Sequence, residues 1–106
     1  MKVLMTKELT EALEKLPIER IKSFISAIDR IKDLNKTEIL ALDKTVKLSR
    51  EGSIDFYAYE ISDPYYVLFA FKPKKTMILL DVMEIVDGNS LKFLAFSKKL
   101  DSKEHA

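Results

Sequence analysis

Apolar and polar residues alternate with a period of two along the middle of the chain, between residues 54 and 82. Three runs rich in β-branched and aromatic residues follow one another there, and two short proline-containing segments separate them. The runs are IDFYAYEI, YYVLFAF and TMILLDV. This arrangement is typical of consecutive antiparallel strands joined by tight turns. The pattern therefore predicts an antiparallel meander at the centre of the fold.

The two faces of the first run differ in character. Ile54, Phe56 and Ala58 fall on one face, whereas Tyr57 and Tyr59 fall on the other. The first face is apolar, so we expect it to meet the helices. The tyrosine face is then expected to be open to ligand or solvent.

The third run is apolar up to Asp81, near its end. Such a run is typical of a central strand that is buried on both sides. A carboxylate in that position needs a partner. We expect Asp81 to make either a structural hydrogen bond or a catalytic contact.

The N-terminal part of the chain has a helical period. The apolar run Lys2 to Met5 predicts an edge strand, Thr6 can cap a helix over residues 7–16, and Pro17 suits the start of a second helix reaching about residue 33. Four isoleucines of that second helix form one stripe: Ile18, Ile21, Ile25 and Ile28. The stripe predicts that a helical hairpin packs on the apolar face of the sheet.

The remaining segments complete a single domain, residues 1–106. Asn35 or Thr37 can cap a short helical turn, a last helix is expected over residues 91–100, and residues 101–106 are expected to be frayed. The sequence thus predicts the α+β class, with an antiparallel meander sheet, an N-terminal strand, a helical hairpin on one face and a short C-terminal helix.

Charge and composition exclude several function classes. The chain has 18 basic and 17 acidic residues, a net charge of +1, whereas a general nucleic-acid binder shows a clear basic excess. The absence of cysteine excludes disulfides, thiolate chemistry and cysteine metal sites. No run reaches the roughly 18 apolar residues of a membrane span, and the opening MKVLMT is not a signal peptide. We expect a cytoplasmic protein without a cofactor, a metal or a membrane partner.

The order of elements around this meander resembles the RelE/ParE superfamily of toxins from bacterial toxin–antitoxin pairs. Within it, the chain is most similar to the HigB-like, phage-derived branch, whose strands read approximately lyElR, yRvLFaF and ivlLhgF. The corresponding segments here are FYAY, YYVLFAF and MILLDV, and YYVLFAF differs from the family string at one position. The resemblance covers most of residues 1–86 in element order. It implies a RelE/ParE-like fold.

The resemblance also implies a function. Such toxins cleave messenger RNA, often on the ribosome, without a metal. A 2′-hydroxyl is the nucleophile, a general base takes its proton, and cations stabilise the charge on the phosphate. The positions that match the family's catalytic groups are Tyr57, Tyr59, Tyr66 and Asp81. The implied partner is an acidic, partly disordered antitoxin that wraps the helical hairpin or adds to the sheet edge, giving a hetero-oligomer.

The chain departs from the family where the chemistry is expected. Both matched arginines are tyrosines, Tyr59 and Tyr66, and a phenol with a pKa of about 10 brings no positive charge. A nuclease would then need Asp81 or a perturbed tyrosine as its base. Its cations, or the contacts to a partner, would come from residues outside the family pattern: Lys47, Arg50, Lys72, Lys74 and Lys75, with Lys92, Lys98 and Lys99 further along.

Three function classes stay open. The first is a metal-independent endoribonuclease toxin that inhibits translation. The second is a non-enzymatic binder on the same fold, such as a gyrase-type poison, because a fold does not fix a function. The third is a decayed member that binds only its antitoxin. The same residues also have structural interpretations, since tyrosines favour strands and the lysines of KPKK can solvate a hairpin tip.

Overall fold

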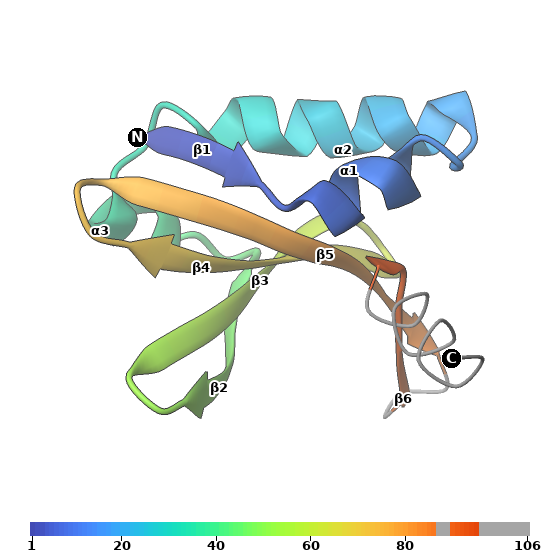
Figure 1. Ribbon diagram of the computed structural model, residues 1–106. Coiled ribbons are helices and arrows are strands. Elements are labelled where there is room, and N and C mark those ends of the chain that lie inside the picture. The colour runs from blue at the N-terminus through green and yellow to red at the C-terminus, as the bar shows by residue number, and fades with distance from the viewer. Residues whose placement is uncertain (87–89, 96–106) are drawn as a thin grey trace.

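A computed structural model describes residues 1–86 and 90–95 of the 106-residue chain (Figure 1). The helices are α1 (Lys7–Leu13), α2 (Ile18–Ile31) and α3 (Lys36–Leu40). The strands are β1 (Lys2–Met5), β2 (Thr45–Glu51), β3 (Ile54–Ser62), β4 (Tyr65–Lys72), β5 (Thr76–Val86) and β6 (Ser90–Phe93). In Figure 1, α1 and α2 lie on one face of the sheet, and the hairpin of β2 and β3 curls away from them.

The described strands form one sheet in the order β1-β5-β4-β3-β2, with β6 also paired to β5. The meander from β2 to β5 is antiparallel throughout, whereas β1 runs parallel to β5. One edge of β5 pairs with β4, and the other edge pairs first with β1 and then with β6. The α+β class predicted from the sequence is confirmed.

Local signals place the helix starts as the sequence predicts. The N–H of Leu9 donates to the Thr6 hydroxyl at 3.2 Å, which caps α1. At α3, the Asn35 side chain accepts from the Glu38 N–H at 2.9 Å, and the Glu38 carboxylate accepts from the Asn35 N–H at 3.0 Å. This reciprocal pair satisfies two backbone donors that a helix leaves without partners.

The isoleucine stripe of α2 faces the core only in part: the prediction is wrong for Ile18 and Ile25, whereas Ile28 packs against the core. Ile18 and Ile25 are 59% and 52% exposed, whereas Phe24 and Ile31 are buried. The helix carries two overlapping apolar stripes, separated by about one residue or 100° of rotation. The stripe of Phe24, Ala27 and Ile31 is buried, whereas the isoleucine stripe is exposed at Ile18 and Ile25 and half-buried at its other two residues.

The alternation along β3 is present, but its two faces are inverted relative to the prediction. Tyr57 and Tyr59 are 7% and 4% exposed and belong to the core between helices and sheet, whereas Ile54 is 49% exposed. The Tyr57 ring stacks on Phe69, with the ring centroids 5.7 Å apart. Large aromatic rings bury more area than Ile54 could, so the tyrosine face forms the core.

The expected C-terminal helix is wrong at its start. Residues 91–93 lie in β6, where Phe93 pairs with Met83 and Leu91 with Ile85. The predicted last strand extends to Val86, which offers β6 a long edge. The rest of the expected helix, with Lys98 and Lys99, and the expected frayed tail lie outside the described residues. No described helix is long and apolar enough to cross a membrane.

Candidate functional site

Two of the four residues matched to the family's catalytic groups are part of the core. Tyr57 lies in a ring cluster with Phe69 and Phe71, with centroid distances of 5.5–5.7 Å. Tyr59 is buried on the same side of β3. Both rings point toward the helices, so the expectation that they form an open surface is wrong. Their position on the helix side separates them from Tyr66 and Asp81.

Asp81 lies on the other face of the sheet, opposite Leu68 of β4. It is 2% exposed, and its Oδ1 accepts hydrogen bonds from the N–H groups of Val82 at 2.8 Å and Ala95 at 2.7 Å. The carboxylate therefore ties the segment after β6 to the middle of β5. The buried carboxylate has the partners that the sequence analysis required.

Tyr66 belongs to a polar group that we call the open-face cluster, consisting of Lys44, Glu60 and Tyr66. The Tyr66 hydroxyl donates to Glu60 Oε1 at 3.4 Å, and Lys44 Nζ lies 3.8 Å from Glu60 Oε2. The Glu60 N–H also donates to the Lys44 carbonyl at 3.0 Å. The Glu60 side chain is 31% exposed, so a ligand on this face can reach its carboxylate.

The charges within the open-face cluster indicate which of its groups donates a proton and which accepts one. Burial, followed by the negative charges of Glu60 and Asp63, raises the pKa of Tyr66. Its phenol is therefore protonated at neutral pH and acts as a donor. Glu60 is the group with an accessible lone pair, and Lys44 brings a positive charge beside it. The cluster thus holds a base, a donor and a cation on one surface.

Sequence reasoning missed Glu60 and Lys44. Glu60 is the one charged residue on the face of β3 that carries Phe56 and Ala58, and the hairpin register places it opposite Tyr66. That register follows from the SDP turn, so the sequence held a signal for this pair. Lys44 lies before β2 and could be placed only with the fold.

The cations expected to serve RNA or a partner occupy two other places. Lys47 and Arg50 of β2 both pair with Asp55, at 3.6 Å and 2.9 Å, on the Tyr57 side of the sheet. The hydrogen bond from Arg50 holds the pKa of Asp55 below its usual value. Lys72, with the turn after it, lies at the opposite end of β4 from Tyr66. The structure therefore does not gather these cations around Tyr66 and Asp81.

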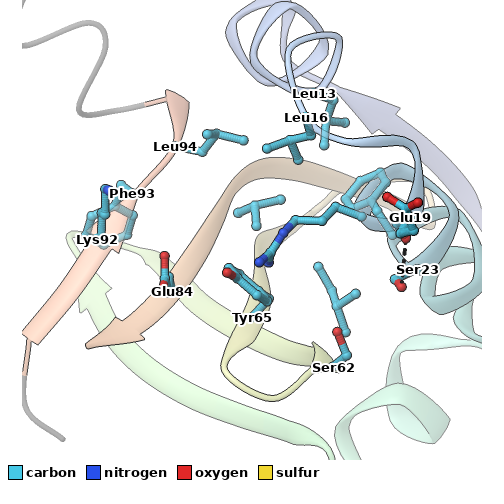
Figure 2. Close-up of a pocket in the computed structure, with 14 residues that line it drawn as sticks. Leu13, Leu16, Glu19, Ser23, Ser62, Tyr65, Glu84, Lys92, Phe93 and Leu94 are labelled. Atoms are coloured by element: carbon cyan, nitrogen blue, oxygen red, sulfur yellow. Dashed lines mark hydrogen bonds between the residues drawn. The ribbon is translucent and has the colours of Figure 1, made fainter. Parts of the chain in front are cut away.

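A groove that the sequence pattern did not predict opens at the end of the sheet where β3 turns into β4 (Figure 2). This end groove has a volume of about 680 Å³. Its walls come from the end of α1, the first half of α2, the turn between β3 and β4, and the strands β5 and β6. The apolar lining residues are Leu13, Leu16, Phe24, Ile61, Val82, Phe93 and Leu94.

Polar groups stand around the end groove. The Arg20 guanidinium lies over the Tyr65 ring, 3.6 Å from its centroid, and Glu19, Glu84 and Lys92 also line the groove (Figure 2). Arginine stacked on an aromatic ring with apolar surface beside it is the composition of protein-binding hot spots. The groove is therefore suited to apolar side chains of a partner segment. Within the described residues, no group of three or more His, Cys, Asp or Glu could hold a metal.

Comparisons with known proteins add one finding. No family model and no curated protein sequence matches this chain. Among solved structures, it is similar to a chain from the "Crystal structure of archaeal RelE-RelB complex from Pyrococcus horikoshii OT3". The two chains are 21% identical and superpose with a TM-score of 0.61, over 84% of this chain and 97% of the other. This chain therefore has a RelE-like fold.

Proposed function

We propose that this chain is the toxin component of a type II toxin–antitoxin pair and that RNA is its target. The observation that carries the proposal is the RelE-like fold, which matches a chain solved in a RelE–RelB complex over 97% of that chain. The strand string YYVLFAF supports the same assignment from the sequence. Cytoplasmic action, inhibition of translation and membership of the HigB-like branch are parts of this proposal.

The chemistry is assigned to the open-face cluster. Glu60 takes the proton of an RNA 2′-hydroxyl, whose oxygen attacks the neighbouring phosphorus. The bond from phosphorus to the 5′-oxygen breaks, leaving a 2′,3′-cyclic phosphate and a 5′-oxygen that takes a proton from water to become a hydroxyl. Lys44 offsets negative charge on the phosphate, and the protonated Tyr66 donates a hydrogen bond to it. No metal takes part in this scheme.

Cleavage is expected to be slow. Lys44 is the cation of the cluster, it is half exposed, and it lies 3.8 Å from Glu60 rather than free to meet a phosphate. Removal of one group that stabilises charge in a transition state lowers turnover by roughly 10²–10³-fold in well-studied enzymes. The arginines of the family pattern are absent at the matched positions, so a deficit of at least this size is expected relative to a family member that carries them.

The antitoxin is proposed to anchor apolar side chains in the end groove. The groove offers about 680 Å³ of volume, and Arg20 on Tyr65 gives a flat, partly charged surface beside it. An amphipathic segment binds such a groove through a few apolar anchors. An antitoxin segment in the end groove would not cover the open-face cluster, which lies on the other face of the sheet. Inhibition of the toxin would then depend on other parts of the toxin–antitoxin complex.

Induced expression followed by mapping of RNA 5′ ends tests the proposed activity. Wild-type protein is expected to slow growth and produce new RNA ends, Glu60→Gln is expected to abolish the new ends, and the matched surface variant Glu11→Gln is expected to retain them. Circular dichroism controls for folding. New ends that persist in Glu60→Gln would remove Glu60 as the base.

A second candidate function is non-enzymatic binding of a protein target. It is favoured because Tyr57 and Tyr59 are core residues and Asp81 holds backbone N–H groups, so three of four matched catalytic positions are engaged in structure. Growth inhibition without new RNA ends, unchanged in Glu60→Gln, would establish this alternative. A plasmid supercoiling assay would then identify or exclude a gyrase-type target.

A further inference from the structure

Five exposed lysines from different parts of the chain gather at the end of the sheet where β4 turns into β5. We call this surface the lysine pole: Lys2, Lys36, Lys72, Lys74 and Lys75. Lys36, Lys72 and Lys75 line one cleft of about 710 Å³. The backbone of Lys2 is joined to the turn, because its N–H donates to the Lys75 carbonyl at 3.0 Å. Within the described part of the chain, none of the five forms a salt bridge.

Few negative charges offset the lysine pole. Two carboxylates line the cleft, Asp33 and Glu38, and Glu38 already accepts a hydrogen bond from the Asn35 N–H at 3.0 Å. Three lysines face these two acids in the cleft, and Lys2 and Lys74 add two further positive charges beside it.

The turn holds its lysines at a backbone position that normally disfavours them. Lys74 and Lys75 have φ angles of +64° and +55°, in the left-handed region. The turn between β2 and β3 uses Gly52 for the same φ of +64°. A side chain is disfavoured there relative to glycine, and such outliers concentrate at functional positions. Two lysines in place of glycine or asparagine indicate that their charge has a use outside folding.

One cation of the pole is fixed in place by packing. The Lys36 ammonium lies over the Phe71 ring, 5.3 Å from its centroid. This contact orients the charge toward the cleft that Lys72 and Lys75 also line. A hydrogen bond also holds the turn, because the Thr76 hydroxyl donates to the Lys74 carbonyl at 3.3 Å. Less ordering is therefore needed when an anionic ligand binds.

The lysine pole reaches the face of the open-face cluster through Lys72, whereas Lys36 lies over Phe71 on the helix side of the sheet. By alternation along β4, Lys72 lies on the same face as Ala70, Leu68 and Tyr66. The six residue-to-residue steps from Tyr66 to Lys72 span about 20 Å at roughly 3.3 Å per residue. A linear anion that runs along this row would touch the pole at one end and the cluster at the other. A single nucleic-acid strand, which carries one negative charge per nucleotide, fits that geometry.

We propose that the lysine pole binds the phosphodiester backbone of single-stranded RNA and holds the strand across the open face toward Glu60. The inference rests on the proposed function for its choice of RNA. Its chemistry is that of ammonium groups with phosphates, which carries no sequence information, so it sets affinity and direction and leaves base selection to other contacts. An acidic peptide segment is the competing ligand, and the test includes it.

The test measures binding of a labelled single-stranded RNA to the full chain by fluorescence anisotropy across a series of salt concentrations. The site variant is Lys72→Gln with Lys75→Gln, and the matched control is Lys15→Gln with Lys22→Gln, two exposed lysines on the helical hairpin. Loss of two phosphate contacts is expected to reduce the slope of log affinity against log salt by about 1.4. The control is expected to keep the wild-type slope.

A second variant separates charge from folding. Lys74→Gly with Lys75→Gly removes both charges and relieves the left-handed backbone, so RNA binding is expected to weaken while the melting temperature rises by roughly 4–8 °C. A variant that binds RNA less tightly and is also less stable would overturn the argument from backbone strain.

The remaining outcomes are decisive as well. An equal loss of slope in the site variant and the control would show diffuse electrostatics and overturn the site. Absence of RNA binding, or tighter binding of an acidic peptide than of RNA, would also overturn it. A DNA strand of the same sequence shows whether the 2′-hydroxyl contributes. RNA cleavage by the wild-type protein is mapped in parallel, so absent cleavage with an intact slope difference overturns the proposed function alone, whereas cleavage without a slope difference overturns the lysine pole alone.

Discussion

Two isoleucines on one helix provide a stability test with a built-in control. Ile31 of α2 is 0% exposed and Ile25 is 52% exposed, although the sequence pattern placed Ile25 in the core. Truncation to alanine removes three carbon groups, worth about 0.8 kcal/mol each when fully buried. For Ile31→Ala this gives about 2.4 kcal/mol before the cavity contribution, so about 2–5 kcal/mol in total.

For Ile25→Ala the same calculation gives a much smaller loss of unfolding free energy. About half of the side chain is already in water, which halves the transfer free energy to about 1.2 kcal/mol. No enclosed cavity forms, and alanine is the better helix former by some tenths of a kcal/mol. The expected destabilisation is therefore below about 1 kcal/mol.

Thermal unfolding followed by circular dichroism distinguishes these values, because each kcal/mol corresponds to roughly 4–8 °C in melting temperature for a domain near this size. Both variants lack the same atoms and sit on the same helix, so differences in composition cancel. Equal destabilisation by the two substitutions would refute the orientation of α2 described here. It would also return the isoleucine stripe to the core.

Four further outcomes are expected. Asn35→Ala removes the cap of α3 and is expected to cost about 1 kcal/mol of unfolding free energy, measured by chemical denaturation. Arg50→Gln is expected to raise the pKa of Asp55, followed by NMR. Because that pKa is lowered in the folded protein, its stabilisation is present above the unfolded value near 3.8 and is lost as pH falls through the folded value. Asp81→Ala leaves buried N–H groups without their acceptor and is expected to cost about 1–3 kcal/mol by thermal unfolding. Arg20→Ala is expected to weaken antitoxin binding by about 1–2 kcal/mol in calorimetry, with unchanged melting temperature.

The meander and the helix starts were predictable because they depend on local chemistry. The meander follows from three apolar runs separated by turns, and the caps at Thr6 and Asn35 follow from residues that accept backbone N–H bonds. The parallel pairing of β1 with β5 was not predicted, since it joins residues more than 70 positions apart. Its partner could be chosen only once the sheet was complete.

The choice of face was beyond the sequence pattern. Alternation shows that Tyr57 and Tyr59 share a side of β3, but both sides of that strand carry apolar area. Three-dimensional packing decided, because the Tyr57 ring completes a cluster with Phe69 and Phe71. The same ambiguity affected α2, where two apolar stripes overlap. In both elements the apolar pattern identified residues that share a side, but it did not identify which side is buried.

The candidate site was only partly predictable for the same reason. Tyr66 was selected by its match to a catalytic position of the family, and the structure has it on the open face, but its partners depend on tertiary contacts. Glu60 reaches it through the register of a hairpin, and Lys44 reaches Glu60 from outside the strands. The end groove requires α1, α2, β5 and β6 together, and no single segment shows it. The lysines of the KPKK turn could be recognised in sequence, whereas their left-handed backbone could not.

We propose that this chain cleaves RNA through a 2′-hydroxyl, with Glu60 as the base. The most direct measurement is cleavage of a translated messenger RNA on purified ribosomes, with either ribose or 2′-deoxyribose at the mapped cleavage position. The account predicts slow cleavage of the ribose substrate to a 2′,3′-cyclic phosphate, and none of the 2′-deoxy substrate or with Glu60→Gln. Equal cleavage of the two substrates, or no cleavage of either by wild-type protein that inhibits growth, would contradict it.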